Sequence, residues 1–94
     1  MDSQPEGWPY YQLVEDDQFQ EEIKREFGGH REWDDIRRII EEDILRAPGE
    51  FPFLPGSRLH FAPLNTVPAR IIIFEVDGLN RIVRYRAVRP TGSG

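Results

Sequence analysis

The 94-residue chain contains no cysteine. Disulfide bonds and thiolate chemistry are therefore excluded, and a reducing cytoplasm is compatible with this composition. No apolar run approaches the roughly 20 residues of a membrane helix, and the first residues lack the basic start and apolar core of a signal peptide. We therefore expect a cytoplasmic protein that makes no membrane contact.

Motifs for metal and cofactor chemistry are also missing. The two histidines, His30 and His60, lie in separate segments, and no closed set of metal ligands surrounds them. The chain has no glycine-rich phosphate loop, and its few serines lie outside any nucleophile-elbow pattern. We therefore predict no metal site and no cofactor.

Lysine is nearly absent, and charge is divided unevenly along the chain. Residues 1–50 carry 15 acidic and 6 basic side chains (net −9), whereas residues 51–94 carry 2 acidic and 6 basic side chains (net +4). All six basic residues of the second half are arginines, whose planar fork grips phosphate or carboxylate at two points. This pattern favours recognition of an anionic partner. The alternative is that basic strands and acidic helices neutralise each other within the fold.

The stretch 69–89 predicts a β-hairpin. Two β-prone runs meet at Asp77-Gly78-Leu79-Asn80, where Gly and Asn tolerate the positive φ of a tight turn. Side chains alternate along a strand, so Arg84 and Arg86 are expected on one face. The opposite face would carry Val83, Tyr85 and Ala87.

Two helices are predicted in the acidic half. Phe19, Ile23 and Phe27 form an apolar stripe over 17–27, with Asp16 or Asp17 as the cap and Gly28-Gly29 as the end. A second helix over about 31–46 ends at Pro48-Gly49, and its apolar face is expected to hold Trp33, Ile36, Ile39, Ile40 and Ile44. Helices joined by so short a break pack antiparallel as a helical hairpin.

The remaining segments complete a β-α-α-β-β-β order. Residues 9–14 predict a short first strand, 47–57 a loop held by aromatic side chains, and 58–64 an alternating strand, with Pro63 and Pro68 bracketing the next turn. The fold class is therefore α+β, in which a short N-terminal strand and an antiparallel helical hairpin precede a three-stranded antiparallel meander. We expect a single domain over 9–90, with flexible ends at 1–8 and 91–94.

Candidate functional residues follow from the predicted strand faces. Arg58 and His60 are expected to share a surface with Arg84 and Arg86. Arginines stabilise charge that develops on phosphate, and a histidine acts as general acid or base near neutral pH. We therefore assign His60 and Arg84 as candidate catalytic residues for metal-free RNA cleavage. The alternative for His60 is a strand histidine without chemistry.

The element order and the last hairpin resemble the RelE/ParE toxin superfamily of toxin–antitoxin systems. The matching residues are Ala69–Asp77, ARIIIFEVD, and Arg81–Arg89, RIVRYRAVR. By this resemblance Arg70 matches an arginine that opens the third strand and lies in the active groove of nuclease members. Arg58, Arg70, Arg84 and Arg86 are thus the candidate phosphate- or partner-binding residues.

The resemblance implies two activities. RelE-like members cleave messenger RNA on the ribosome without metal, whereas ParE-like members poison DNA gyrase, and an antitoxin neutralises either type. The acidic net charge of −5 opposes binding to RNA and favours the ParE-like branch. The alternative function is a non-enzymatic interaction module, such as a phage or accessory protein, that binds a partner through its arginines or its acidic helices.

Overall fold

The secondary-structure elements follow the predicted β-α-α-β-β-β order, and the α+β fold class is confirmed. The computed structural model describes residues 10–28 and 31–91. Its elements are β1 (Gln12–Glu15), α1 (Asp17–Phe27), α2 (Arg31–Arg46), a 3-10 turn (Pro48–Glu50), β2 (His60–Leu64), β3 (Arg70–Asp77) and β4 (Ile82–Pro90). The first strand therefore begins three residues later than predicted.

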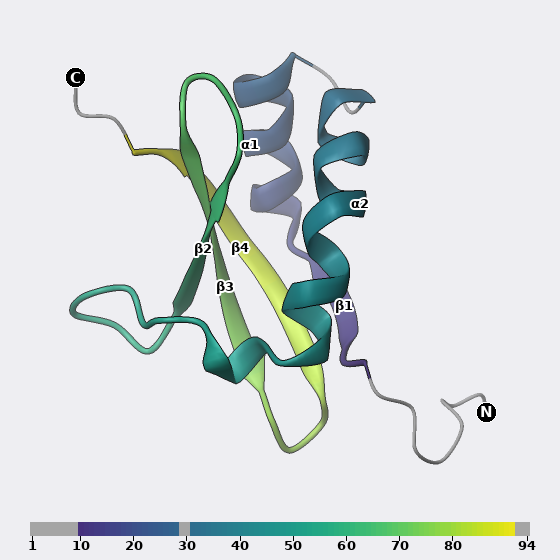
Figure 1. Cartoon of the computed structure of the whole chain (residues 1–94), viewed down its shortest axis with the longest axis vertical. Coiled ribbons are helices and arrows are strands. Elements are labelled where there is room, and N and C mark those ends of the chain that lie inside the picture. The colour runs from purple at the N-terminus through teal and green to yellow at the C-terminus, as the bar shows by residue number, and fades with distance from the viewer. Residues whose placement is uncertain (1–9, 29–30, 92–94) are drawn as a thin grey trace.

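All four strands belong to one sheet with the order β1-β4-β3-β2. The β2–β3 and β3–β4 pairs are antiparallel and form the predicted meander, whereas β1 lies parallel to β4. The sequence had not indicated this last neighbour. Both helices run antiparallel on one side of the sheet (Figure 1).

Helix α1 has the predicted bounds, but its N-terminus is not capped as expected. The chain leaves the helix at Gly28, whose φ of +69° suits glycine and whose N–H donates to Lys24 O at 2.8 Å. Asp16 is the N-cap residue, yet its side chain makes no capping hydrogen bond. Its carboxylate instead contacts arginines of β4.

Helix α2 also has the predicted bounds, but one residue of its predicted apolar face is exposed. Trp33 and Ile44 are buried as expected, whereas Ile39 is 75% exposed and Leu45 is buried in its place. Around the helix axis, Ile39 and Leu45 lie about 120° to either side of the centre of the apolar face that Trp33 and Ile44 belong to. The Leu45 side is buried because it faces the segment that leads into β1, where Tyr11 N–H donates to Leu45 O at 2.8 Å.

An aromatic cluster forms the core between the helices and the sheet. The Phe19 ring lies 5.4 Å from both the Trp33 and Tyr85 rings, and Phe74 lies 6.4 Å from Tyr85. All four side chains are at most 2% exposed. Edge-to-face and tilted contacts of this kind add about 0.5–1.5 kcal/mol each to the gain from burial. Tyr85 is thus a core residue, as its strand position predicted.

A β-bulge in β4 changes the predicted strand faces. Phe74 pairs with Tyr85, but Ile73 pairs with Ala87, so Arg86 is an extra residue without a partner on β3. The inserted residue reverses the alternation beyond it. Ala87 therefore leaves the face of Tyr85, and Val88 turns toward the helices instead. The prediction that placed Ala87 beside Tyr85 is wrong for this reason.

The turns differ from the sequence expectation in two details. In the β3–β4 turn the positive φ, +57°, belongs to Arg81, and Asp77 stabilises the turn by accepting the backbone and side-chain N–H groups of Asn80 at 3.1 and 2.9 Å. Pro63 lies inside β2 and does not bracket the following turn.

The predicted flexible ends lie outside the described residues, apart from Thr91, whose N–H donates to Ala69 O at 3.0 Å. Neither helix of the described chain has the length and apolar character that crossing a bilayer requires.

Candidate functional site

Arg84 and Arg86 lie together, as predicted, but each contacts a carboxylate of the same chain. The Asp16 carboxylate forms ion pairs with Arg86 Nε at 2.9 Å and with Arg84 Nη1 at 3.4 Å. The Glu75 carboxylate forms a further ion pair with Arg86 Nη1 at 2.9 Å. We call these four residues the arginine cluster. Its two positive charges meet two negative charges, so a phosphate would have to compete with Asp16 and Glu75.

His60 is held in the structure by one hydrogen bond to a backbone carbonyl and by two ring contacts. Its Nδ1–H donates to Phe51 O at 2.7 Å, and its ring stacks on Phe53 at 4.3 Å and on Phe74 at 5.7 Å between centroids. The side chain is only 6% exposed. Such a histidine serves packing, because one nitrogen is committed to a carbonyl and little of the ring reaches solvent.

The predicted surface shared by His60 and Arg84 is not formed. His60 pairs with Phe74, which pairs with Tyr85, so these three side chains lie in one row facing the helices. Arg84 pairs with Glu75 in the adjacent row, whose side chains point to the opposite face. The sheet therefore separates the two candidate catalytic residues.

Arg70 is buried at the start of β3 and contacts the end of α1. Its Nε donates to Glu26 Oε1 at 3.0 Å, its Nη2 donates to Glu26 O at 3.2 Å, and its guanidinium lies 4.4 Å from the Phe27 ring centroid. At 8% exposure it faces the helix side of the sheet. Arg70 therefore does not join the arginine cluster, and its contacts are those of a structural residue.

A further arginine, Arg89, pairs with the buried carboxylate of Glu22, which also accepts Val88 N–H at 3.0 Å. Neither residue is among those that the sequence predicted to be functional. Arg58 is exposed in the loop before β2 and makes no ion pair with any residue in 10–28 or 31–91. The contacts of Arg70, Arg84, Arg86 and Arg89 thus join the arginine-rich second half to the acidic first half, as the mutual-neutralisation alternative implies.

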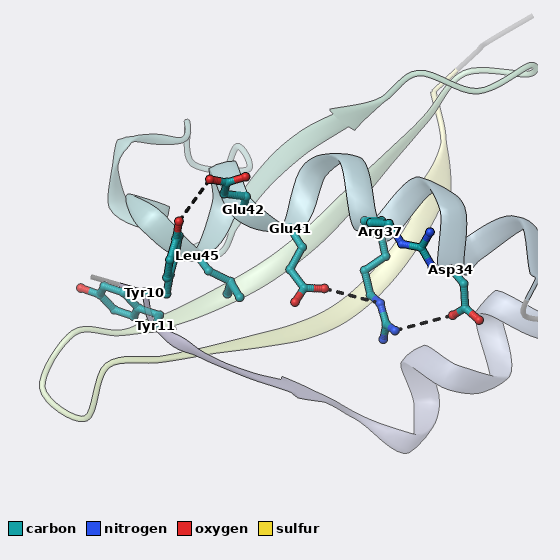
Figure 2. A pocket seen from close by; sticks show the side chains of 8 residues that line it. Tyr10, Tyr11, Asp34, Arg37, Glu41, Glu42 and Leu45 are labelled. Atoms are coloured by element: carbon teal, nitrogen blue, oxygen red, sulfur yellow. Dashed lines mark hydrogen bonds and ion pairs between the residues drawn. The ribbon is translucent and has the colours of Figure 1, made fainter. Parts of the chain in front are cut away.

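A groove lies between α2 and the segment that leads into β1 (Figure 2). Its volume is about 590 Å³, which is within the range of ligand pockets. We call it the α2–β1 groove, and its lining residues are Tyr10, Tyr11, Asp34, Arg37, Arg38, Glu41, Glu42 and Leu45. The helical members recur every three or four residues, so they form one face of α2.

Ion pairs hold the walls of the α2–β1 groove. Arg37 reaches across it to Glu15 at 3.3 Å and also contacts Asp34 and Glu41 at 3.6 and 3.5 Å. At the other end Tyr10 Oη donates to Glu42 Oε2 at 3.1 Å (Figure 2). The shape of the groove is therefore fixed by contacts on both walls.

Sequence reasoning missed the α2–β1 groove although part of its signal was visible. Tyr10 and Tyr11 are adjacent aromatics before a short strand, and Asp34, Arg38, Glu41 and Leu45 fall on one helical face. The acidic helices were considered only as a charged surface that neutralises the arginines or binds a partner. What could not be seen was that β1 would lie beside that face.

No group of three potential metal-ligating side chains comes together within the described ranges. Tyr85, another residue with possible acid–base chemistry, is enclosed in the core, and burial raises the pKa of its phenol above the ordinary value. A neutral, enclosed phenol cannot deprotonate a substrate at neutral pH. Tyr85 therefore does not serve as a general base in this structure.

No protein-family model, curated protein or solved structure matches the chain. The resemblance to the RelE/ParE superfamily therefore stays a prediction.

Proposed function

We propose that this protein is a non-enzymatic interaction module that binds a protein partner in the α2–β1 groove. The observation that carries the proposal is the groove itself, because its lining combines two tyrosines, a leucine and charged side chains held by ion pairs. Tyrosine and arginine are the residues most enriched where proteins bind one another tightly. The engaged arginines and the packed His60 support binding over catalysis.

Arg38 and Ile39 offer a matched pair for testing this proposal. Arg38 lines the groove, whereas its neighbour Ile39 is 75% exposed and lies outside the lining. A photo-crosslinking amino acid at position 38 should yield one discrete protein adduct in cells, and the same amino acid at position 39 should yield none. Tyr11→Ala should abolish the adduct. Equal products at both positions, or an adduct that survives Tyr11→Ala, would contradict the proposal.

The second candidate is a growth-inhibiting toxin of the RelE/ParE type, located in the cytoplasm and neutralised by an antitoxin. Two observations support it. The element order is the one that the resemblance implies, and Arg84 and Arg86 lie together on the sheet face opposite the helices. Its ParE-like form, which acts through protein contacts, is compatible with binding in the α2–β1 groove. Its RelE-like form needs Asp16 and Glu75 to release the arginines.

Induced expression in a bacterial host distinguishes these forms. Arrest with intact transcripts that is lost in Arg38→Glu supports a protein target in the groove. Arrest with cleaved transcripts that is lost in the Arg84→Ala/Arg86→Ala double variant supports the nuclease form. Normal growth with a folded, expressed protein counts against the toxin candidate and leaves the crosslinking result to decide the first one.

A further inference from the structure

The two outer strands of the sheet, β2 and β1, differ in whether the backbone groups on their outer edges have partners. On β2, Leu59 O accepts Leu54 N–H at 2.6 Å and Phe61 N–H donates to Pro52 O at 3.0 Å. Two residues further along, the next backbone nitrogen on this outer edge belongs to Pro63, which has no N–H group. A preceding loop and a proline thus close the β2 edge against further pairing.

The edge of β1 is covered only just before the strand, where Tyr11 N–H donates to Leu45 O of α2 at 2.8 Å. Gln12 and Asp16 donate their N–H groups to Arg81 O and Tyr85 O, at 2.8 and 3.3 Å. Because successive residues of a strand point to opposite sides, the backbone groups of Leu13 and Glu15 face away from β4. Within the described residues, no hydrogen-bond partner for these two amides is present.

This open edge continues from the α2–β1 groove, which Tyr10 and Tyr11 line just before β1 and which no residue of β1 itself lines. Tyr11 contacts Leu45 at one end, and Glu15 contacts Arg37 at the other, so β1 lies antiparallel to α2. The helix face from Asp34 to Leu45 is about 16 Å long, which matches about five residues of extended chain. A groove of this length suits an extended peptide, and the free amides of Leu13 and Glu15 lie next to it along the chain.

We propose that the partner segment binds as a fifth strand, extended and paired with Leu13 and Glu15 of β1. This inference rests on the proposed function and specifies the chemistry of the partner. Main-chain hydrogen bonds give affinity in this mode, and side-chain contacts give specificity. Tyr11 and Leu45 suit an apolar side chain at one end. Arg38, for which no ion pair with a described residue is present, suits an acidic side chain farther along.

A displayed library covering all sequences of about five residues, with short fixed flanks, tests the inference on the full chain. Selected peptides should be enriched in an acidic and an apolar position. Amide hydrogen exchange of the complex should slow at Leu13 and Glu15 by about tenfold or more, with Gln12 and Val14 unchanged because they already bond to β4. Arg38→Glu should weaken binding about tenfold, whereas the matched control Ile39→Glu should not.

Failure of this inference can be told apart from failure of the proposed function. A library that yields no binder, or binders that leave exchange at Leu13 and Glu15 unchanged, overturns strand addition. The proposed function survives that result if the crosslink at position 38 still depends on Tyr11. Loss of both results overturns both proposals.

Discussion

A buried polar atom is costly unless a partner lies within reach, and three such atoms lack one among the described residues: Trp33 Nε1, Arg70 Nη1 and Tyr85 Oη. Tyr85 is the clearest case, because its ring is enclosed by Phe19, Trp33 and Phe74. Its hydroxyl therefore adds a desolvation cost without a compensating hydrogen bond.

We predict that Tyr85→Phe leaves the free energy of unfolding unchanged or raises it by about 1 kcal/mol, measured by urea unfolding at pH 7. Burial also raises the pKa of Tyr85, so the folded value exceeds the unfolded one. The free energy of unfolding is therefore unaffected by ionisation of this group below about pH 10, where Tyr85 is neutral in both states. It falls as pH rises toward the folded pKa, because the unfolded chain loses the phenol proton first. Tyr85→Phe should remove this alkaline loss. A loss of more than about 1 kcal/mol at pH 7 would show that the hydroxyl has a favourable partner.

Alanine variants of His60 and Arg58 distinguish a structural residue from an exposed one two positions away. His60→Ala removes two ring contacts and a hydrogen bond, so we expect a loss of about 2–3 kcal/mol in thermal or urea unfolding. Arg58→Ala should change stability by less than about 0.5 kcal/mol, because the side chain is exposed. A His60→Ala variant that keeps its stability would reopen a chemical role for this histidine.

At the scale of elements, β4 is covered on one edge by two different neighbours. β1 pairs with residues 82–85, and beyond that point α1 lies against the strand, where Glu22 accepts Val88 N–H. The carboxylate thereby satisfies a backbone donor that β1 is too short to reach. Helix α1 and strand β4 are joined by this contact as well as by their apolar side chains.

We predict that Glu22→Ala lowers the free energy of unfolding by about 2 kcal/mol, because a buried backbone donor and Arg89 both lose a charged acceptor. The control is Glu21→Ala. Its side chain is 72% exposed and only reaches Lys24 at 3.9 Å, so the expected change is below about 0.5 kcal/mol. Equal effects of the two variants in urea unfolding would contradict the role given to Glu22.

The elements differ in how far the sequence could predict them. The bounds of α1 and α2 follow from local signals, since periodicity, Gly28 and Pro48 all act within one or two turns. The pairing of β1 with β4 joins residue 12 to residue 82, and no local pattern encodes it. The α2–β1 groove and the Asp16–Arg86 pair both depend on that long-range contact, so neither could be predicted. The bulge at Arg86 was missed although the adjacent apolar residues Ala87 and Val88 break the alternation that precedes them.

At the scale of the molecule, the acidic first half and the arginine-rich second half neutralise each other at their contacts. Asp16, Glu22 and Glu26 of the first half meet Arg86, Arg89 and Arg70 of the second. What remains is a net charge of −5, which opposes binding to polyanions.

We therefore predict that the protein shows no measurable affinity for single-stranded RNA at about 0.15 M salt, assayed by fluorescence anisotropy. The Asp16→Asn/Glu75→Gln double variant should gain salt-sensitive RNA binding, because it releases Arg84 and Arg86 from their carboxylates. Adding Arg84→Ala and Arg86→Ala to that variant is the control and should abolish the gain. Tight RNA binding by the unaltered chain would instead support the nuclease form.

The parallel pairing of β1 with β4 also has a consequence for synthesis. During translation Gln12 to Glu15 emerges before both helices, and its partner in β4, Ile82 to Tyr85, emerges only after both helices and strands β2 and β3. The first strand must therefore wait with both edges unpaired while the helices and strands β2 and β3 are made. Long-range closure of this kind slows folding. A nascent-chain factor that binds extended segments would find its target here, at the same edge that we propose a partner occupies in the finished protein.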